Sequence, residues 1–188
     1  MSLELWSTIA SIGTFVVIGA TAVSAVIQLR HLRASNQLEG LLTVLARVED
    51  PSFNAWVDGA RHVLEENMPD PNYRGKIANL TYDRENNPWL NLANSYEWVG
   101  SLVKNGLIPE ESFMDVYAFR ILRAWELAEP VVAIIRRRVP QVWENFEFLV
   151  VRAERFVALN PNGTYPKGVS RKEITDRWLM ADTALGQA

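Results

Sequence analysis

The residues from Leu5 to Leu29 read LWSTIASIGTFVVIGATAVSAVIQL and contain no Asp, Glu, Lys or Arg. Glu4 precedes this run and Arg30 follows it. As an α-helix the run would extend about 37 Å, enough to cross the ~30 Å hydrocarbon core of a bilayer with some tilt. A cleavable signal peptide would begin with basic residues, and the run is preceded by none. The stretch therefore predicts a transmembrane anchor over residues 1–29.

The charges that flank this run predict its orientation. Arg30, His31 and Arg33 follow it, whereas only Glu4 and the amino terminus precede it. Positive residues favour the cytoplasmic side of a membrane. We therefore expect a single-pass protein with its N-terminus outside and residues 30–188 forming a cytoplasmic helical domain.

Small and hydroxyl residues are frequent within the run, and several are spaced four apart. Such residues let a second helix approach closely, as in contacts between membrane protein subunits. The alternative is an ordinary anchor that faces only the lipid bilayer, because small residues are common in membrane helices. The residues expected to form the helix-packing interface are Ala10, Gly13, Thr14, Ala20 and Ser24.

The anchor helix is predicted to continue past the lipid surface. Apolar residues recur at helical spacing until Asp50-Pro51 interrupts the pattern, and no Gly- or Ser-rich linker intervenes. This pattern predicts one helix over residues 3–49 whose second half enters the domain core. The apolar stripe consists of Leu29, Leu32, Leu38, Leu41, Leu42, Leu45 and Val48.

The rest of the chain predicts an all-α fold, a cytoplasmic bundle of about five further helices with no strand. Ser52 is the expected N-cap of a helix ending near residue 67, followed by a loop over residues 68–73. Asn87 and Pro88 are expected to begin a helix that Gly106 ends. Helices are also expected from Pro109, with a kink or break at Pro130, and over residues 141–159. A capping box at residues 170–173 predicts a last short helix.

The composition excludes several classes of function. The chain has no cysteine and two histidines, His31 and His62, and neither histidine follows a glutamate at the spacing of a di-metal bundle site. A net charge of -3 is unlike that of a nucleic-acid-binding protein. Phosphate-binding glycine loops and nucleophile–base pairs are absent from the sequence. We therefore expect no metal, no cofactor, no catalytic residues and no nucleic-acid partner.

Two glutamates lie between aromatic residues on predicted helices. Glu97 is flanked by Tyr96 and Trp98, and Glu147 by Phe146 and Phe148. Inward-facing carboxylates of this kind are expected to pair with arginines, which more often supports structural specificity than catalysis. We expect a structural ion-pair network of Glu97 and Glu147 with Arg120 and Arg123, or with Arg152. A ligand-binding or catalytic role for these acids is the alternative.

Several short motifs resemble a bacterial family of unknown function. They are the segments 28–30 (QLR), 96–100 (YEWVG), 102–108 (LVKNGLI), 125–126 (WE) and 145–149 (NFEFL). The resemblance covers residues 5–155 approximately and implies one N-terminal membrane helix with an all-helical cytoplasmic domain. It also implies the bacterial inner membrane as the location. It carries no activity and no catalytic residues.

These features favour a non-enzymatic accessory subunit that docks on a larger membrane protein complex, with a respiratory or photosynthetic assembly the first host to examine. The second hypothesis is a membrane-anchored signalling or regulatory module that acts as a homo-oligomer. A membrane-bound enzyme with an acidic site is the third.

Overall fold

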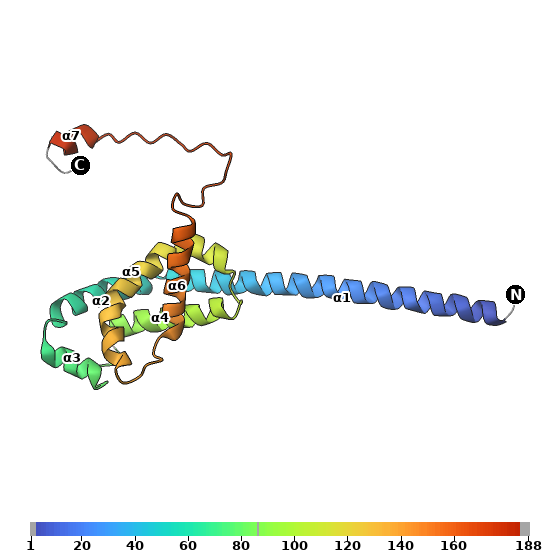
Figure 1. Cartoon of the computed structure of the whole chain (residues 1–188), viewed down its shortest axis with the longest axis horizontal. Helices are drawn as coiled ribbons and strands as arrows, with labels where there is room; N and C mark the ends of the chain where they lie inside the picture. Colours follow the sequence, from blue (N-terminus) through green and yellow to red (C-terminus); the bar gives the residue numbers. More distant parts are fainter. Residues whose placement is uncertain (1–2, 86, 185–188) are drawn as a thin grey trace.

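A computed structural model describes residues 3–85 and 87–184, and all regular structure within these ranges is helical (Figure 1). The all-α prediction is confirmed. The helices are α1 (Leu3–Val48), α2 (Pro51–Asn67), α3 (Pro71–Ala78), α4 (Pro88–Lys104), α5 (Glu110–Arg136), α6 (Glu144–Leu159) and α7 (Leu179–Ala184).

Helix α1 extends far beyond the bundle that its C-terminal end joins (Figure 1). Among the described residues, the segment Trp6–Val48 is the one helix long and apolar enough to cross a membrane. Its most apolar window is 0% buried within the chain. Phe15, for example, is 78% exposed. An apolar surface of this length is unfavourable in water, so it needs lipid or protein around it.

The last turns of α1 belong to the bundle, but the predicted apolar stripe is only partly inside it. Four members of the stripe are more than half exposed: Leu29, Leu32, Leu38 and Leu42. Val44 and Val48 are fully buried in the core. Further back, the Gln37 side chain donates a hydrogen bond from Nε2 to the carbonyl of Gly106 at 3.1 Å. A Cβ on Gly40 would lie 2.8 Å from the carbonyl oxygen of Leu107, so the turn between α4 and α5 rests directly on the α1 backbone. One unbroken helix therefore connects the exposed apolar segment with the core.

The starts of α2 and α3 differ from the sequence-based expectation. Asp50, not Ser52, caps α2: its carboxylate accepts a hydrogen bond from the Ser52 backbone N–H, and Pro51 takes the first helical position. Asp70 caps α3 in the same way, through the N–H of Asn72. The segment expected to be a loop over residues 68–73 thus contains the start of a helix.

The expected boundaries of α4 are confirmed, but the expected capping by Asn87 is not. Asn87 holds the N-cap position and Pro88 the first helical position, yet the Asn87 side chain makes no capping hydrogen bond. Its Oδ1 is buried without a hydrogen-bond partner among the described residues. At the other end, Gly106 follows the helix with φ of 68°, a backbone conformation that glycine adopts without strain.

Helix α5 continues through Pro130 as a single helix to Arg136, so the chain is not split there. Helix α6 begins at Glu144, not near Gln141, because residues 140–143 form a turn and Trp143 takes a left-handed φ of 55°. The last short helix is α7. The expected capping box over residues 170–173 has no regular structure, so that prediction is wrong.

The core is centred on α4, which packs most extensively against α6 and α2. Tyr96 of α4 stacks on Phe146 of α6 with ring centroids 4.8 Å apart, and Trp125 of α5 meets Phe146 edge-on at 5.1 Å. Trp89 is 1% exposed and donates its indole N–H to the Tyr73 hydroxyl at 3.0 Å. These aromatic contacts join α3, α4, α5 and α6 around one apolar centre.

Candidate functional site

The small residues of α1 lie within one side of the helix, because 100° per residue places them in a sector of roughly 120°. They are all exposed: Ala10, Gly13, Thr14, Ala20 and Ser24. The Thr14 hydroxyl donates to the carbonyl of Ala10 at 2.8 Å, which satisfies its proton within α1. This surface therefore offers close approach of a second helix more than hydrogen bonds across the contact.

Glu97 of α4 does not pair with an arginine. One carboxylate oxygen accepts a hydrogen bond from the Asn145 side-chain amide at 2.7 Å, and the other accepts the backbone N–H of Phe146 at 2.9 Å. Helix N-termini carry unsatisfied N–H groups and a partial positive charge. Glu97 therefore serves as a half-buried cap that holds the first turn of α6 against α4.

Glu147 pairs elsewhere and faces outward. Its carboxylate lies 2.7 Å from Nη1 of Arg136, the last residue of α5, and its side chain is 48% exposed. The same guanidinium donates to the carbonyl of Val142 from Nε at 3.0 Å and from Nη2 at 2.9 Å. This pairing closes the turn between α5 and α6.

Arg120 joins α5 to the end of α1. Its guanidinium lies 3.0 Å from a carboxylate oxygen of Glu49, which also accepts a hydrogen bond from the Tyr117 hydroxyl at 2.9 Å. Burial, together with the hydrogen bond to the Glu49 carboxylate and its negative charge, raises the pKa of Tyr117 to about 12. This cluster fixes the C-terminal end of α1 on α5.

Arg123 makes no ion pair or hydrogen bond with the described residues. The expected network of Glu97 and Glu147 with Arg120 and Arg123 is therefore wrong, because Glu97, Glu147 and Arg120 each serve a separate helix junction and Arg123 serves none. Arg152, the alternative partner, pairs with Glu110 instead.

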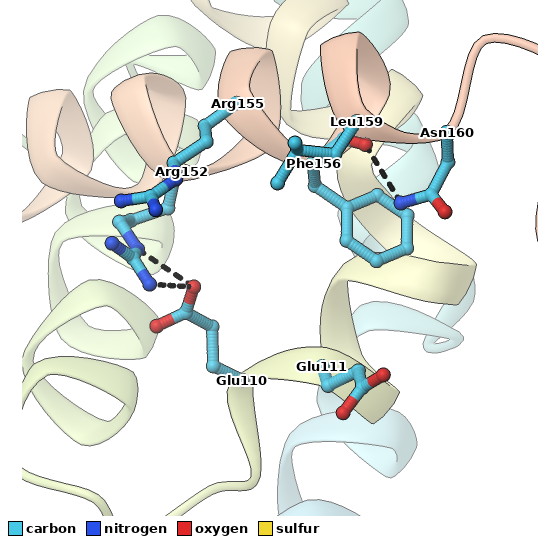
Figure 2. Close-up of a pocket in the computed structure, with 7 residues that line it drawn as sticks. All are labelled: Glu110, Glu111, Arg152, Arg155, Phe156, Leu159 and Asn160. Atoms are coloured by element: carbon cyan, nitrogen blue, oxygen red, sulfur yellow. Dashed lines mark hydrogen bonds and ion pairs between the residues drawn. The ribbon is translucent and has the colours of Figure 1, made fainter.

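The Glu110–Arg152 pair borders a cavity of about 420 Å³ between the start of α5 and the end of α6 (Figure 2). Arg152 approaches one Glu110 oxygen with both Nε and Nη2 at 2.6 Å. Glu111 lies apart from this pair, below the ring of Phe156 in the view (Figure 2). Each charge of the pair is neutralised by its partner, and among residues 3–85 and 87–184 no group of acids and histidines could hold a metal ion. This arrangement is suited to joining α5 to α6 and lacks a base–nucleophile pair.

Sequence reasoning missed the Glu49–Tyr117–Arg120 cluster and the contact of Gly40 with Leu107. The partners are distant in sequence: those of the cluster lie 68 to 71 residues apart, and Gly40 of α1 meets the turn between α4 and α5. A glycine in the middle of a helical apolar stripe was the available hint, since such a glycine often marks a close approach.

The two glutamates provide a matched test of these assignments. Replacing Glu97 with glutamine should lower the free energy of unfolding by about 1–3 kcal/mol, because a half-buried carboxylate loses its charge and one acceptor at a helix end. Replacing Glu147 with glutamine should lower the free energy of unfolding by less than about 1 kcal/mol, as for other exposed ion pairs. Urea unfolding of the full chain in mild detergent, followed by circular dichroism, measures both. Equal effects would contradict the capping role of Glu97.

A family model described as a domain of unknown function (DUF4760) matches residues 15–153 of the chain. The matched span includes most of α1, all of α2 to α5 and most of α6. It agrees with the range of the resemblance found from the short motifs. Neither the curated proteins nor the solved structures contain a significant match.

Proposed function

We propose that this chain, which belongs to the family of domains of unknown function DUF4760, is a non-enzymatic single-pass accessory subunit that docks on a larger membrane protein complex. The observation that carries the proposal is the double nature of α1. One part exposes an apolar surface of membrane length, and the other part is built into the core of the helical domain.

The rigid junction supports a positioning role for the domain. A flexible linker would let the domain sample many orientations relative to the membrane. A continuous helix instead gives the domain a fixed orientation, and its contacts with the bundle are made at Gln37, Gly40, Val44 and Glu49. Fixed geometry benefits a subunit that contacts its host both within the bilayer and outside it. Simultaneous contacts of this kind raise affinity without requiring either to be strong.

The flanking charges support an orientation with the N-terminus outside and the domain in the cytoplasm. Arg30 and Arg33 are exposed on α1, seven and four residues before Gln37, whose side chain forms a hydrogen bond with the turn after α4. The bacterial inner membrane is the location that the proposal assigns, and respiratory and photosynthetic assemblies are the first hosts to examine.

The C-terminal segment adds a further exposed apolar surface. After α6 the chain leaves the bundle as an extended tail that ends in α7 (Figure 1). Ile174 is 91% exposed, Trp178 71% and Met180 87%. Tryptophan and methionine are typical of binding surfaces. While they stay exposed to water, these side chains do not stabilise the fold of the chain. Contact with a host subunit would bury them.

The alternative function is a signalling or regulatory module that acts as a homo-oligomer. The same small-residue side of α1 favours it, because two copies of one helix can pack through such residues as readily as two different helices.

Mild detergent extraction followed by native mass spectrometry distinguishes the two functions. An accessory subunit should be recovered mainly in a complex with other membrane proteins. Replacing Ala10, Gly13, Ala20 and Ser24 together with leucine should release it, because the added side chains prevent close helix approach. The matched control replaces Gly19 and Ala22 with leucine. These residues lie on the opposite side of α1, so the control should leave the complex intact.

Recovery of a homo-oligomer without other proteins would reject the accessory function in favour of the alternative. Release by alkaline carbonate without detergent would reject the membrane anchor itself, since an inserted helix stays with the lipid.

A further inference from the structure

A cavity of about 190 Å³ lies between α2, α4 and α5, separate from the Glu110–Arg152 cavity. Its charged lining is entirely basic: Arg61 comes from α2, and Arg120 and Arg123 come from successive turns of α5. No aspartate or glutamate is among the residues that line it. The cavity is therefore a place of positive charge in a protein whose net charge is -3.

Two of these arginines have no counter-charge. Arg61 and Arg123 make no ion pair or hydrogen bond with any part of the chain that the structure describes. The third, Arg120, shares its charge with Glu49 at 3.0 Å. Free guanidinium groups on both sides of one cavity are suited to holding the oxygens of an anion, since their N–H groups match a carboxylate in geometry.

The inner wall of the cavity is apolar except for one hydroxyl. Phe53 is 4% exposed and Tyr96 2%, and their rings meet edge-on at 5.6 Å. The Tyr96 hydroxyl has no hydrogen-bond partner among the described residues, although Arg120 lies near enough to act on it electrostatically. Burial raises the pKa of the Tyr96 phenol, so at neutral pH it keeps its proton. Within the described residues, Asn87 Oδ1 is the one fully buried side-chain polar atom without a partner, so the Tyr96 hydroxyl is open to the cavity, where an anion would supply an acceptor.

We infer that this cavity is a binding site for a small organic carboxylate with a short apolar body. Arg61 and Arg123 would hold the carboxylate, Tyr96 would donate a hydrogen bond to it, and Phe53 with Leu127 would contact the hydrocarbon part. The apolar wall favours such an ion over inorganic phosphate, which would leave the wall without a contact and lose more hydration on entry. The site is independent of the proposed docking function.

Its place in the fold makes a membrane lipid an unsuitable source of the carboxylate. The cavity lies beside Arg120 and so at the Glu49 end of α1. About twenty helical residues separate Glu49 from the end of the uncharged run, which is roughly 30 Å of helix. A soluble ligand reaches this position, whereas the head group of a lipid in the anchor's own bilayer does not.

Titration calorimetry on the full chain in lipid nanodiscs tests the site, with hexanoate as the probe. Hexanoate should bind saturably, and hexanamide and inorganic phosphate should bind at least about tenfold more weakly, which corresponds to ~1.4 kcal/mol. Raising the NaCl concentration should weaken hexanoate binding because the arginines are solvent-accessible. Titration of hexanoate into nanodiscs without the protein is the control for its partition into lipid.

Substitutions locate the binding. R61M and R123M should each weaken hexanoate binding about tenfold or more, and Y96F should weaken it several-fold, with unchanged thermal unfolding. The matched control is R155M, which removes an exposed arginine from the other cavity. Absence of saturable binding, equal binding of hexanamide, or an equal effect of R155M would each overturn the inference. Phosphate binding in place of hexanoate would also overturn it.

Discussion

Replacing Gly100 with alanine is expected to destabilise the helical domain by about 3 kcal/mol or more, the upper part of the range for overpacked cores. A Cβ at this position would lie 2.1 Å from the backbone carbonyl oxygen of Asn145. The obstacle is backbone, so no rotation of a side chain relieves it, and α4 and α6 must separate. Urea unfolding of the full chain in mild detergent, followed by circular dichroism, measures the change.

Gly75→Ala is the matched control for this prediction. Gly75 also lies in a helix, α3, but a Cβ there would meet nothing within 4 Å. The substitution should therefore stabilise the protein by about 0.5–1 kcal/mol, because alanine loses less backbone entropy in a helix than glycine. If Gly100→Ala were as well tolerated as Gly75→Ala, the close packing of α4 on α6 would be contradicted.

Replacing Val44 with aspartate is expected to lower the free energy of unfolding by about 3–5 kcal/mol, the cost of a buried charge without a partner. Val44 is 0% exposed although it belongs to the same helix as the exposed apolar segment. The measurement is again urea unfolding in detergent, with tryptophan fluorescence as a second signal for the bundle.

The control for Val44 is Leu42→Asp. Leu42 is 56% exposed on the same helix, so the substitution should change stability by no more than about 0.5 kcal/mol. A Val44→Asp protein as stable as the unmodified one would show that the end of α1 does not belong to the core. The domain would then have no fixed orientation relative to α1, and the proposed function would lose its main support.

The helices that could be predicted are those whose sequence signals come from residues close together in the chain. The uncharged run Leu5–Leu29, the apolar stripe to Val48 and the Asn87-Pro88 start of α4 all signal helix through spacing and capping chemistry. The errors have local causes too. Asp50 and Ser52 are both good caps, and the competition was decided by Pro51, which fits the first helical position. The apolar residues that follow the capping box at residues 170–173, Ile174 and Trp178, are exposed within the described chain, so no burial stabilises a helix there.

The placement of charged side chains could not be predicted in this way. Glu97 lies between aromatic residues as expected, but its partners are an amide and a backbone N–H at 145–146, not an arginine. The basic cavity likewise joins Arg61 to Arg123 across two helices. Which faces meet depends on the packing of side chains throughout the core, a property that no window of sequence contains.

The sequence by itself therefore determined a long apolar helix, its continuation beyond Arg30, and an all-helical domain without cysteine. These properties follow from composition and periodicity, which act over a few turns. Only the tertiary structure decided that the end of this helix is a core element, held by Gln37, Gly40 and Glu49 against turns and helices far along the chain. The physical reason is that burial and close backbone approach arise between segments that are distant in sequence, where local patterns carry no information on the partner.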